Sequence, residues 1–236
     1  MKDLAERVLT RLPAYLPDLA AMVAHPKRTI IARSSGADDD LRNALIFVAL
    51  TVGLGFLLQA PTLPAEIDFI ETAAAMAAFK VVAILLFSAI VHGLFRLLRG
   101  GATYLRTLTA YIYMVSPLYL ALVVLSLIGQ GLLRAYDPEL GLEARRNPLY
   151  FVENPEAFTA FQDQEPLLAG AVTAVNTVGN LATLVWFIVC LGAFRAIHDV
   201  SRRRSALAGF LIILAWWPYA FIILFLAIGM FGRMAP

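Results

Sequence analysis

Lys80 and a stripe of polar side chains lie inside long apolar runs, where an ionisable or amide group is costly and suggests a function. Lys80 lies about ten residues, or about 15 Å of helical rise, from one end of its run. Polar residues of a later run recur every three or four positions and share one helix face: Thr173, Asn176, Thr177, Asn180 and Thr183. Asn176 and Asn180 are expected at about the depth of Lys80, and Ser116 and the carbonyl freed by Pro117 also lie mid-membrane. We therefore predict an intramembrane polar cluster of Lys80, Ser116, Asn176 and Asn180, with the ammonium as hydrogen-bond donor.

A simpler interpretation of the same residues stays open. Lys80 can extend its ammonium along the helix to the membrane surface, and the Asn and Thr side chains can join neighbouring helices by hydrogen bonds. Replacement of Lys80 by Met distinguishes the two, because only the cluster hypothesis predicts a loss of stability or activity.

Five arginines near the ends of apolar runs form a second candidate site, for the anionic headgroups of lipids: Arg96, Arg99, Arg202, Arg203 and Arg204. Each basic residue near a charged membrane surface contributes about 1 kcal/mol of attraction. The alternative is that these arginines only fix the topology of the chain, and the two roles are compatible. His25, His92 and His198 are expected on the same side of the membrane, but their spacing fits no ligand motif, so we expect no metal site.

Motifs for catalysis are absent from the sequence. It contains no Gly-x-Ser-x-Gly, no His-Glu-x-x-His and no phosphate-binding loop, so we expect neither an enzyme nor a cofactor. No Asp or Glu is expected to be embedded in the membrane, which argues against proton-coupled transport. The net charge of +2 is close to neutral and predicts no nucleic-acid partner.

Apolar residues make up 60% of the 236 residues, and the mean hydropathy is +0.75. Soluble domains are usually about 45–50% apolar. The apolar residues form continuous runs, which predict an all-α bundle with five membrane spans at about 43–60, 69–95, 105–133, 167–194 and 206–231.

Two polar segments flank these spans. Residues 1–42 predict an amphipathic arm, with a helix interrupted at Pro13 and Pro17, a second helix from near Asp18 and a third after Pro26. This arm is expected either in the headgroup layer or free in solvent. Residues 134–166 are rich in aromatic residues and predict a lid on the outer face, with Asn154 capping a short helix.

Basic residues are distributed unevenly between the two sides of the predicted membrane. The arm and the loops containing Arg96–Arg106 and Arg195–Arg204 hold fourteen Lys and Arg residues, whereas the opposite side holds four. This bias predicts a cytoplasmic N-terminus and an outer C-terminus.

The segment between the second and third spans is a tight turn. Gly100 and Gly101 are expected to end the incoming helix in the left-handed conformation, and Thr103 to cap the outgoing one.

The arm, the turn and a proline in the third span resemble those of the YIP (Ypt-interacting protein) family, in its bacterial branch. The resemblance rests on Ala24-His25-Pro26-Lys27, Gly100-Gly101-Ala102-Thr103-Tyr104 and Ser116-Pro117, and it extends over about residues 19–231. The signature of eukaryotic members before the first span, an acidic residue followed by Leu-Tyr-Gly-Pro, does not occur here, so binding of Rab GTPases is not implied. The resemblance implies a five-span membrane protein without catalysis that organises membranes and other membrane proteins.

The sequence thus predicts a non-catalytic, multi-pass protein of the bacterial plasma (inner) membrane. Its expected partners are membrane lipids and other membrane proteins or further copies of itself. The alternative is a small transporter, channel or lipid-moving protein that uses a polar cleft around Lys80 and Asn176.

Overall fold

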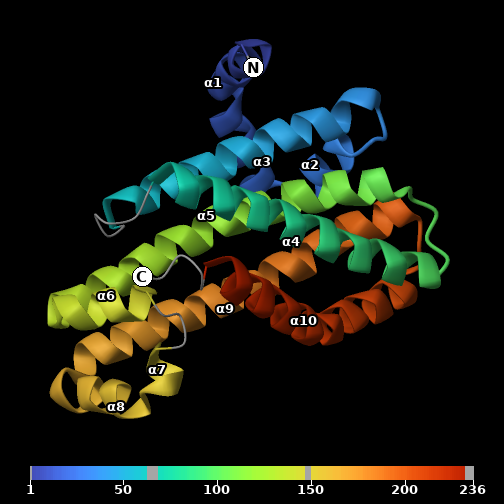
Figure 1. The fold of residues 1–236 in the computed structure, drawn as a ribbon. Coiled ribbons are helices and arrows are strands. Elements are labelled where there is room, and N and C mark those ends of the chain that lie inside the picture. The colour runs from blue at the N-terminus through green and yellow to red at the C-terminus, as the bar shows by residue number, and fades with distance from the viewer. Residues whose placement is uncertain (1, 63–68, 147–149, 232–236) are drawn as a thin grey trace. The chain divides into compact units, whose positions relative to one another are not determined.

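The computed structural model describes residues 2–62, 69–146 and 150–231, and in these ranges the ordered elements are all helical (Figure 1). Two helices form the arm, α1 (Lys2–Ala24) and α2 (Pro26–Arg33). The other elements are α3 (Asp38–Gln59), η1 (Ala60–Thr62), α4 (Phe69–Leu97), α5 (Tyr104–Tyr136), α6 (Pro138–Arg146), α7 (Tyr150–Glu153), α8 (Pro155–Gln164), α9 (Pro166–His198) and α10 (Arg202–Phe231). Glu66 and Asp68 of the acidic first outer loop, and Arg233 of the tail, lie outside the described residues.

Five helices are long and apolar enough to cross a membrane, which confirms the predicted all-α fold with five spans. The apolar segments lie at 39–62, 70–97, 104–136, 166–198 and 202–223. Between 17% and 33% of the most apolar stretch of each helix is buried inside the protein, so much of the apolar surface faces outward. Large side chains such as Trp217, Phe221 and Ile222 are exposed, as a surface in contact with lipid requires.

The chain divides into two compact units. Unit 1 comprises residues 1–119 and 186–236, and unit 2 comprises residues 120–185. Unit 1 therefore contains the arm, α3, α4, α10, the first half of α5 and the last part of α9. The division within α5 falls after Tyr119, two residues beyond Pro117, which lies inside that helix.

Aromatic side chains pack α10 against α4 in unit 1. The Phe87 ring lies 4.6 Å from the Tyr219 ring and 5.3 Å from the Trp216 ring, measured between centroids. The Tyr219 hydroxyl donates a hydrogen bond of 3.1 Å to the carbonyl of Ala83. Tyr219 follows Pro218, so the proline segment of α10 is fixed on its neighbour.

The arm departs from the sequence prediction in one respect. Helix α1 continues through Pro13 and Pro17 to Ala24, so both the interruption expected at these prolines and the separate helix expected from near Asp18 are wrong. Tyr15 and Met22 of this helix are buried, and their packing holds the helix together although proline removes a backbone donor at two positions. The helix predicted after Pro26 is confirmed as α2, with the proline in its first turn.

In unit 2, the segment between α5 and α9 forms α6, α7 and α8 and shares a small core with the adjoining helix ends. The buried members of this core are Leu133, Leu140, Phe161, Ala169 and Val172. About thirty residues cannot bury a core unaided. The ends of α5 and α9 supply the missing apolar surface. Asn154 precedes α8 as expected, but its side chain donates to the carbonyl of Tyr150 at 3.0 Å and makes no capping bond.

Candidate functional site at the hairpin turns

Two hairpin turns of unit 1, α4–α5 and α9–α10, are built on the same backbone pattern. In the first, the amide of Gly100 donates to the carbonyl of Phe95 at 2.8 Å, and the amide of Arg99 donates to that of Arg96 at 3.0 Å. In the second, the amides of Val200 and Asp199 donate to the carbonyls of Arg195 and Ala196 at 3.2 and 3.3 Å. Arg99 and Asp199 have φ of 66° and 51°, so each turn is a Schellman motif closed by a left-handed residue.

The expected role of Gly100 and Gly101 at the end of α4 is wrong in its mechanism. The left-handed residue is Arg99. Glycine is needed at position 100 because the neighbouring atoms leave no room for a Cβ atom there. A Cβ added at Gly100 would lie 2.7 Å from Nδ1 of His198 and 2.8 Å from the Phe95 carbonyl oxygen. The amide of Gly101 donates to the carbonyl of His198 at 2.9 Å, so the two turns are joined directly.

Thr103 and Ser201 begin the outgoing helices in the same way. The amide of Arg106 lies 3.4 Å from Oγ1 of Thr103, which supports the predicted cap of α5. The amide of Arg204 lies 3.4 Å from Oγ of Ser201, which caps α10.

A buried threonine, Thr107, holds a histidine from each incoming helix. Its hydroxyl lies 3.1 Å from Nδ1 of His92, 3.0 Å from Nε2 of His198 and 3.1 Å from the carbonyl oxygen of Thr103. The hydroxyl proton goes to the Thr103 carbonyl, so both imidazoles donate their N–H to the threonine oxygen. This network assigns the proton to Nδ1 of His92 and to Nε2 of His198.

His198 is fully buried, with its ring stacked on Phe95 at 4.6 Å between centroids. Its Nδ1 faces Gly100 and has no hydrogen-bond partner among the described residues. The rings of His92 and Tyr104 meet in a T-shaped contact, and the Tyr104 hydroxyl lies 3.1 Å from Oγ of Ser88. This network could not be predicted from the sequence, because Thr107 gives no sequence signal beyond a polar position one turn after the cap.

The arm is fastened to the same turns by Arg106. Its Nε donates to the carbonyl of Ser34 at 3.0 Å, and its side chain lies against Gly36, which has φ of 99°. Oγ of Ser34 donates in turn to the carbonyl of Ile30 at 2.5 Å, and both residues are fully buried. Arg106 was expected only as a charge that orients the chain; the structure shows that it also anchors α2.

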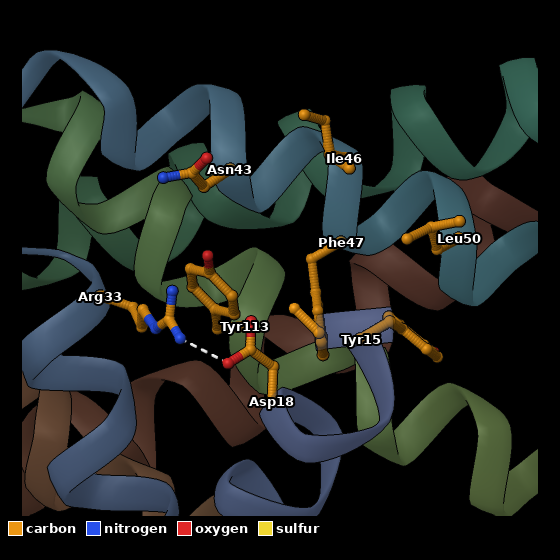
Figure 2. Close-up of a pocket in the computed structure, with 9 residues that line it drawn as sticks. Tyr15, Asp18, Arg33, Asn43, Ile46, Phe47, Leu50 and Tyr113 are labelled. Carbon is orange, nitrogen blue, oxygen red and sulfur yellow. Dashed lines mark hydrogen bonds and ion pairs between the residues drawn. The ribbon is translucent and has the colours of Figure 1, made fainter. Parts of the chain in front are cut away.

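Helix α1 is held on α3 by Tyr15 (Figure 2). Thr51 donates its hydroxyl proton to the carbonyl of Phe47 at 2.8 Å, so the Tyr15 hydroxyl is the donor to Thr51 at 2.9 Å. Burial raises the pKa of the Tyr15 phenol, which keeps this proton in place. Asp18 of α1 forms an ion pair with Arg33 of α2, so the two arm helices are also tied to each other.

The cavity beside Tyr15 is too small for a substrate. Figure 2 shows Asp18, Arg33 and Tyr113 converging at its edge. Its volume of about 20 Å³ is enough for about one water molecule. Asn43 lines it, and its buried Oδ1 has no protein partner within the described ranges. This site therefore fits a structural water.

The residues of the predicted intramembrane cluster lie in different surroundings. In unit 1, Nζ of Lys80 lies over the ring of Tyr119, 4.5 Å from its centroid, and the hydroxyl of Ser116 donates to the carbonyl of Ile112 at 2.7 Å. In unit 2, Asn176 and Asn180 are exposed. A contact of either amide with Lys80 joins the two units and stays a prediction.

The five arginines proposed for lipid headgroups, Arg96, Arg99, Arg202, Arg203 and Arg204, are all exposed in unit 1. Nη1 of Arg96 also donates to the carbonyl of Gly100 at 3.2 Å, so this arginine helps to close its turn. No group of three His, Cys, Asp or Glu side chains among the described residues is arranged to hold a metal ion.

Comparison with known proteins gave one family match. The model of the Yip1 domain matches residues 20–227, a range that includes α2, both hairpin turns and all five apolar segments. No curated protein and no solved structure matches the chain.

Proposed function

This chain belongs to the Yip1 domain family, and from that premise we propose that it is a non-catalytic membrane protein that organises lipids and other membrane proteins. The proposal places its working surface at the two hairpin turns and the docked arm. The observation that carries it is that some polar side chains at these turns are bonded within the protein, whereas others are exposed and charged.

One set of polar groups at the turns is used to hold the structure together. His92 and His198 each bond to Thr107, and Arg106 is bonded to the arm. The exposed arginines Arg99 and Arg202–Arg204 remain accessible for binding to lipids or partner proteins. A buried, mutually bonded network beside an exposed charged surface supports a rigid binding platform rather than an active site.

We infer that this surface lies in the cytoplasm of a bacterial cell, since the basic residues predominate on its side. Anionic headgroups of the cytoplasmic leaflet are then within reach of the arginines. The guanidinium group suits phosphate oxygens, because it presents paired donors in a fixed plane.

The lipid part of the proposal is tested by purification in native lipid discs and quantification of the bound lipids. The variant Arg202→Gln, Arg203→Gln, Arg204→Gln is expected to retain less anionic lipid than the unchanged protein. The matched control replaces the same three residues by Lys and keeps the charge. Equal lipid retention by the unchanged protein and the Gln variant would overturn the lipid assignment.

The partner part is tested by identifying the proteins that are co-purified in the same discs. We expect a defined set of membrane proteins that is lost in the Gln variant and kept in the Lys variant. A substrate turned over by the purified protein alone would contradict the non-catalytic assignment.

The alternative of a transporter, channel or lipid-moving protein has a separate test. Single cysteines at Asn176 and Asn180 would react with a membrane-impermeant thiol reagent if these positions line a water-filled cleft. Protection of both from the aqueous reagent, with reaction after detergent solubilisation, would exclude that cleft.

A further inference from the structure

Every exposed residue in the second half of α1, residues 13–24, is apolar. These residues are Pro13, Ala14, Leu16, Pro17, Ala20, Ala21, Val23 and Ala24. Leu16 and Val23 have 64% and 58% of their surface exposed, whereas Tyr15 and Met22 are buried. A helix at a protein surface in water carries polar side chains on its outer face, whereas a helix that is apolar all round belongs in an apolar medium. The composition of this face therefore fits contact with hydrocarbon.

The polar groups of this segment are bonded within the arm. Asp18, its one charged residue, forms an ion pair with Arg33 of α2. At the junction of the two helices, the hydroxyl of Thr29 lies 3.0 Å from the carbonyl oxygen of Ala21 and 2.9 Å from that of His25. Charged and polar groups inside hydrocarbon need such partners from the protein, because water is absent there.

The contacts of Tyr15 show how deep this segment lies along α3. The Tyr15 hydroxyl is bonded to Thr51 at 2.9 Å, and its ring lies 5.1 Å from the Phe47 ring between centroids (Figure 2). Thr51 lies nine positions, or about 13 Å of helical rise, after Arg42, which is the last charged residue of α3. The hydrocarbon layer begins close to that charge, so Tyr15 lies on the order of 10 Å inside it even when α3 is tilted.

Lys27, at the start of α2, gives a second depth marker. A Cβ added at Gly192 of α9 would lie 3.5 Å from Cδ and 3.8 Å from Cε of this lysine. Gly192 lies six positions, or about 9 Å, before the end of α9 at His198. The aliphatic part of Lys27 thus lies beside an apolar span, and its ammonium can extend to the headgroups. Both markers belong to unit 1, so the depth follows from this unit alone.

We propose that residues 13–24 lie in the hydrocarbon of the leaflet on the side of the hairpin turns, and that their exposed side chains contact lipid acyl chains. Helix α2 then leads from this segment back to the turns, where Arg106 holds Ser34. This position is deeper than both positions expected from the sequence, the headgroup layer and solvent. The inference depends on the five-span fold and is independent of the function proposed above.

Nitroxide spin labels in lipid discs measure the depth of this segment. In a Cys190→Ala background, labels at Leu16→Cys and Val23→Cys are expected to collide often with oxygen. Their collisions with the water-soluble complex nickel–EDDA are expected to be several-fold rarer than those of a label at Ala37→Cys. Ala37 is the matched control, because it is exposed in the connection between α2 and α3. Lipids that carry nitroxides at known acyl positions calibrate the depth.

Three results would overturn the proposal. Nickel collisions as frequent at positions 16 and 23 as at position 37 would place the segment in water. A calibrated depth at the level of the phosphates or above would place it in the headgroup layer. Rare collisions with both reagents would mean that protein, and not lipid, covers these side chains.

The energetic consequence is tested by Leu16→Asp, with Leu16→Met as the matched control. A carboxylate that faces hydrocarbon is costly, so Leu16→Asp is expected to loosen the arm. In lipid discs, protease is expected to cleave the arm of this variant several-fold faster than that of the unchanged protein. The Met variant is expected to behave like the unchanged protein, because its side chain stays apolar. Equal cleavage of the two variants would contradict a lipid-facing position 16.

Discussion

The contact between Gly100 and His198 predicts a clear loss of stability on replacement of Gly100 by Ala. The new methyl group would lie 2.7 Å from Nδ1 of His198 and 2.8 Å from the Phe95 carbonyl oxygen. Both distances are shorter than a real carbon contact, and neither neighbour is free to move. The ring is stacked between Phe95 and the turn, and the carbonyl oxygen accepts the 2.8 Å bond that closes the turn.

The expected cost combines overpacking of a buried contact with strain on one backbone hydrogen bond. Together these terms amount to about 2–3 kcal/mol of unfolding free energy. For a chain of this size, such a loss lowers the melting temperature by on the order of 5 °C or more.

The assay uses the one cysteine of the chain, Cys190, which is fully buried. A thiol-reactive dye that fluoresces on reaction reports unfolding of the detergent-solubilised protein during heating. Gly93→Ala is the matched control in α4, because a Cβ there meets no atom within 4 Å. The control is expected to be neutral or stabilised by about 0.5–1 kcal/mol, since Ala favours a helix over Gly.

The result that would refute the reasoning is a Gly100→Ala protein as stable as the Gly93→Ala protein. Gly101→Ala provides a second comparison, because its Cβ would approach the His198 carbonyl only to an ordinary 4.0 Å. Equal destabilisation at both positions of the turn would assign the effect to the backbone and not to the contact with the histidine.

Three further predictions use the same melting assay or limited proteolysis. Thr107→Val is expected to cost about 1–3 kcal/mol, because both imidazoles lose their acceptor. Thr183→Val is the control and should cost less, since the Thr183 hydroxyl bonds only within α9. Arg106→Gln is expected to expose the arm to protease faster than Arg99→Gln does, since of these two arginines Arg106 is the one bonded to the arm; equal cleavage would contradict the anchoring role. Lys80→Met is expected to lower the unfolding free energy by about 1 kcal/mol, because the contact of the ammonium with the Tyr119 ring is lost. An unchanged melting temperature would support the alternative, in which the Lys80 side chain extends to the membrane surface.

Much of the architecture was predictable from the sequence because membrane helices are specified locally. Apolar runs longer than the bilayer core must become helices, since each backbone amide needs a partner within its own segment. This physics determined the five spans. Local signals, a proline at the first helical position and a threonine at a cap, indicated the helix after Pro26 and the start of α5 after Thr103. Continuity of α1 through Pro13 was not predictable, because the free energy that stabilises the continuous helix comes from burial of Tyr15 on another helix.

The turn between Arg96 and Tyr104 shows most clearly what could not be predicted from the sequence. Composition alone indicated a tight turn with glycines, and that much depends on local conformation. Only the tertiary structure assigned the left-handed position to Arg99 and gave Gly100 its role, because the cause is a histidine from α9, about a hundred positions away in the chain. The roles of His92, Thr107 and Arg106 likewise depend on partners from other helices or from the arm. A sequence records the donors and acceptors that a polar residue carries, but its partners depend on which helices pack together.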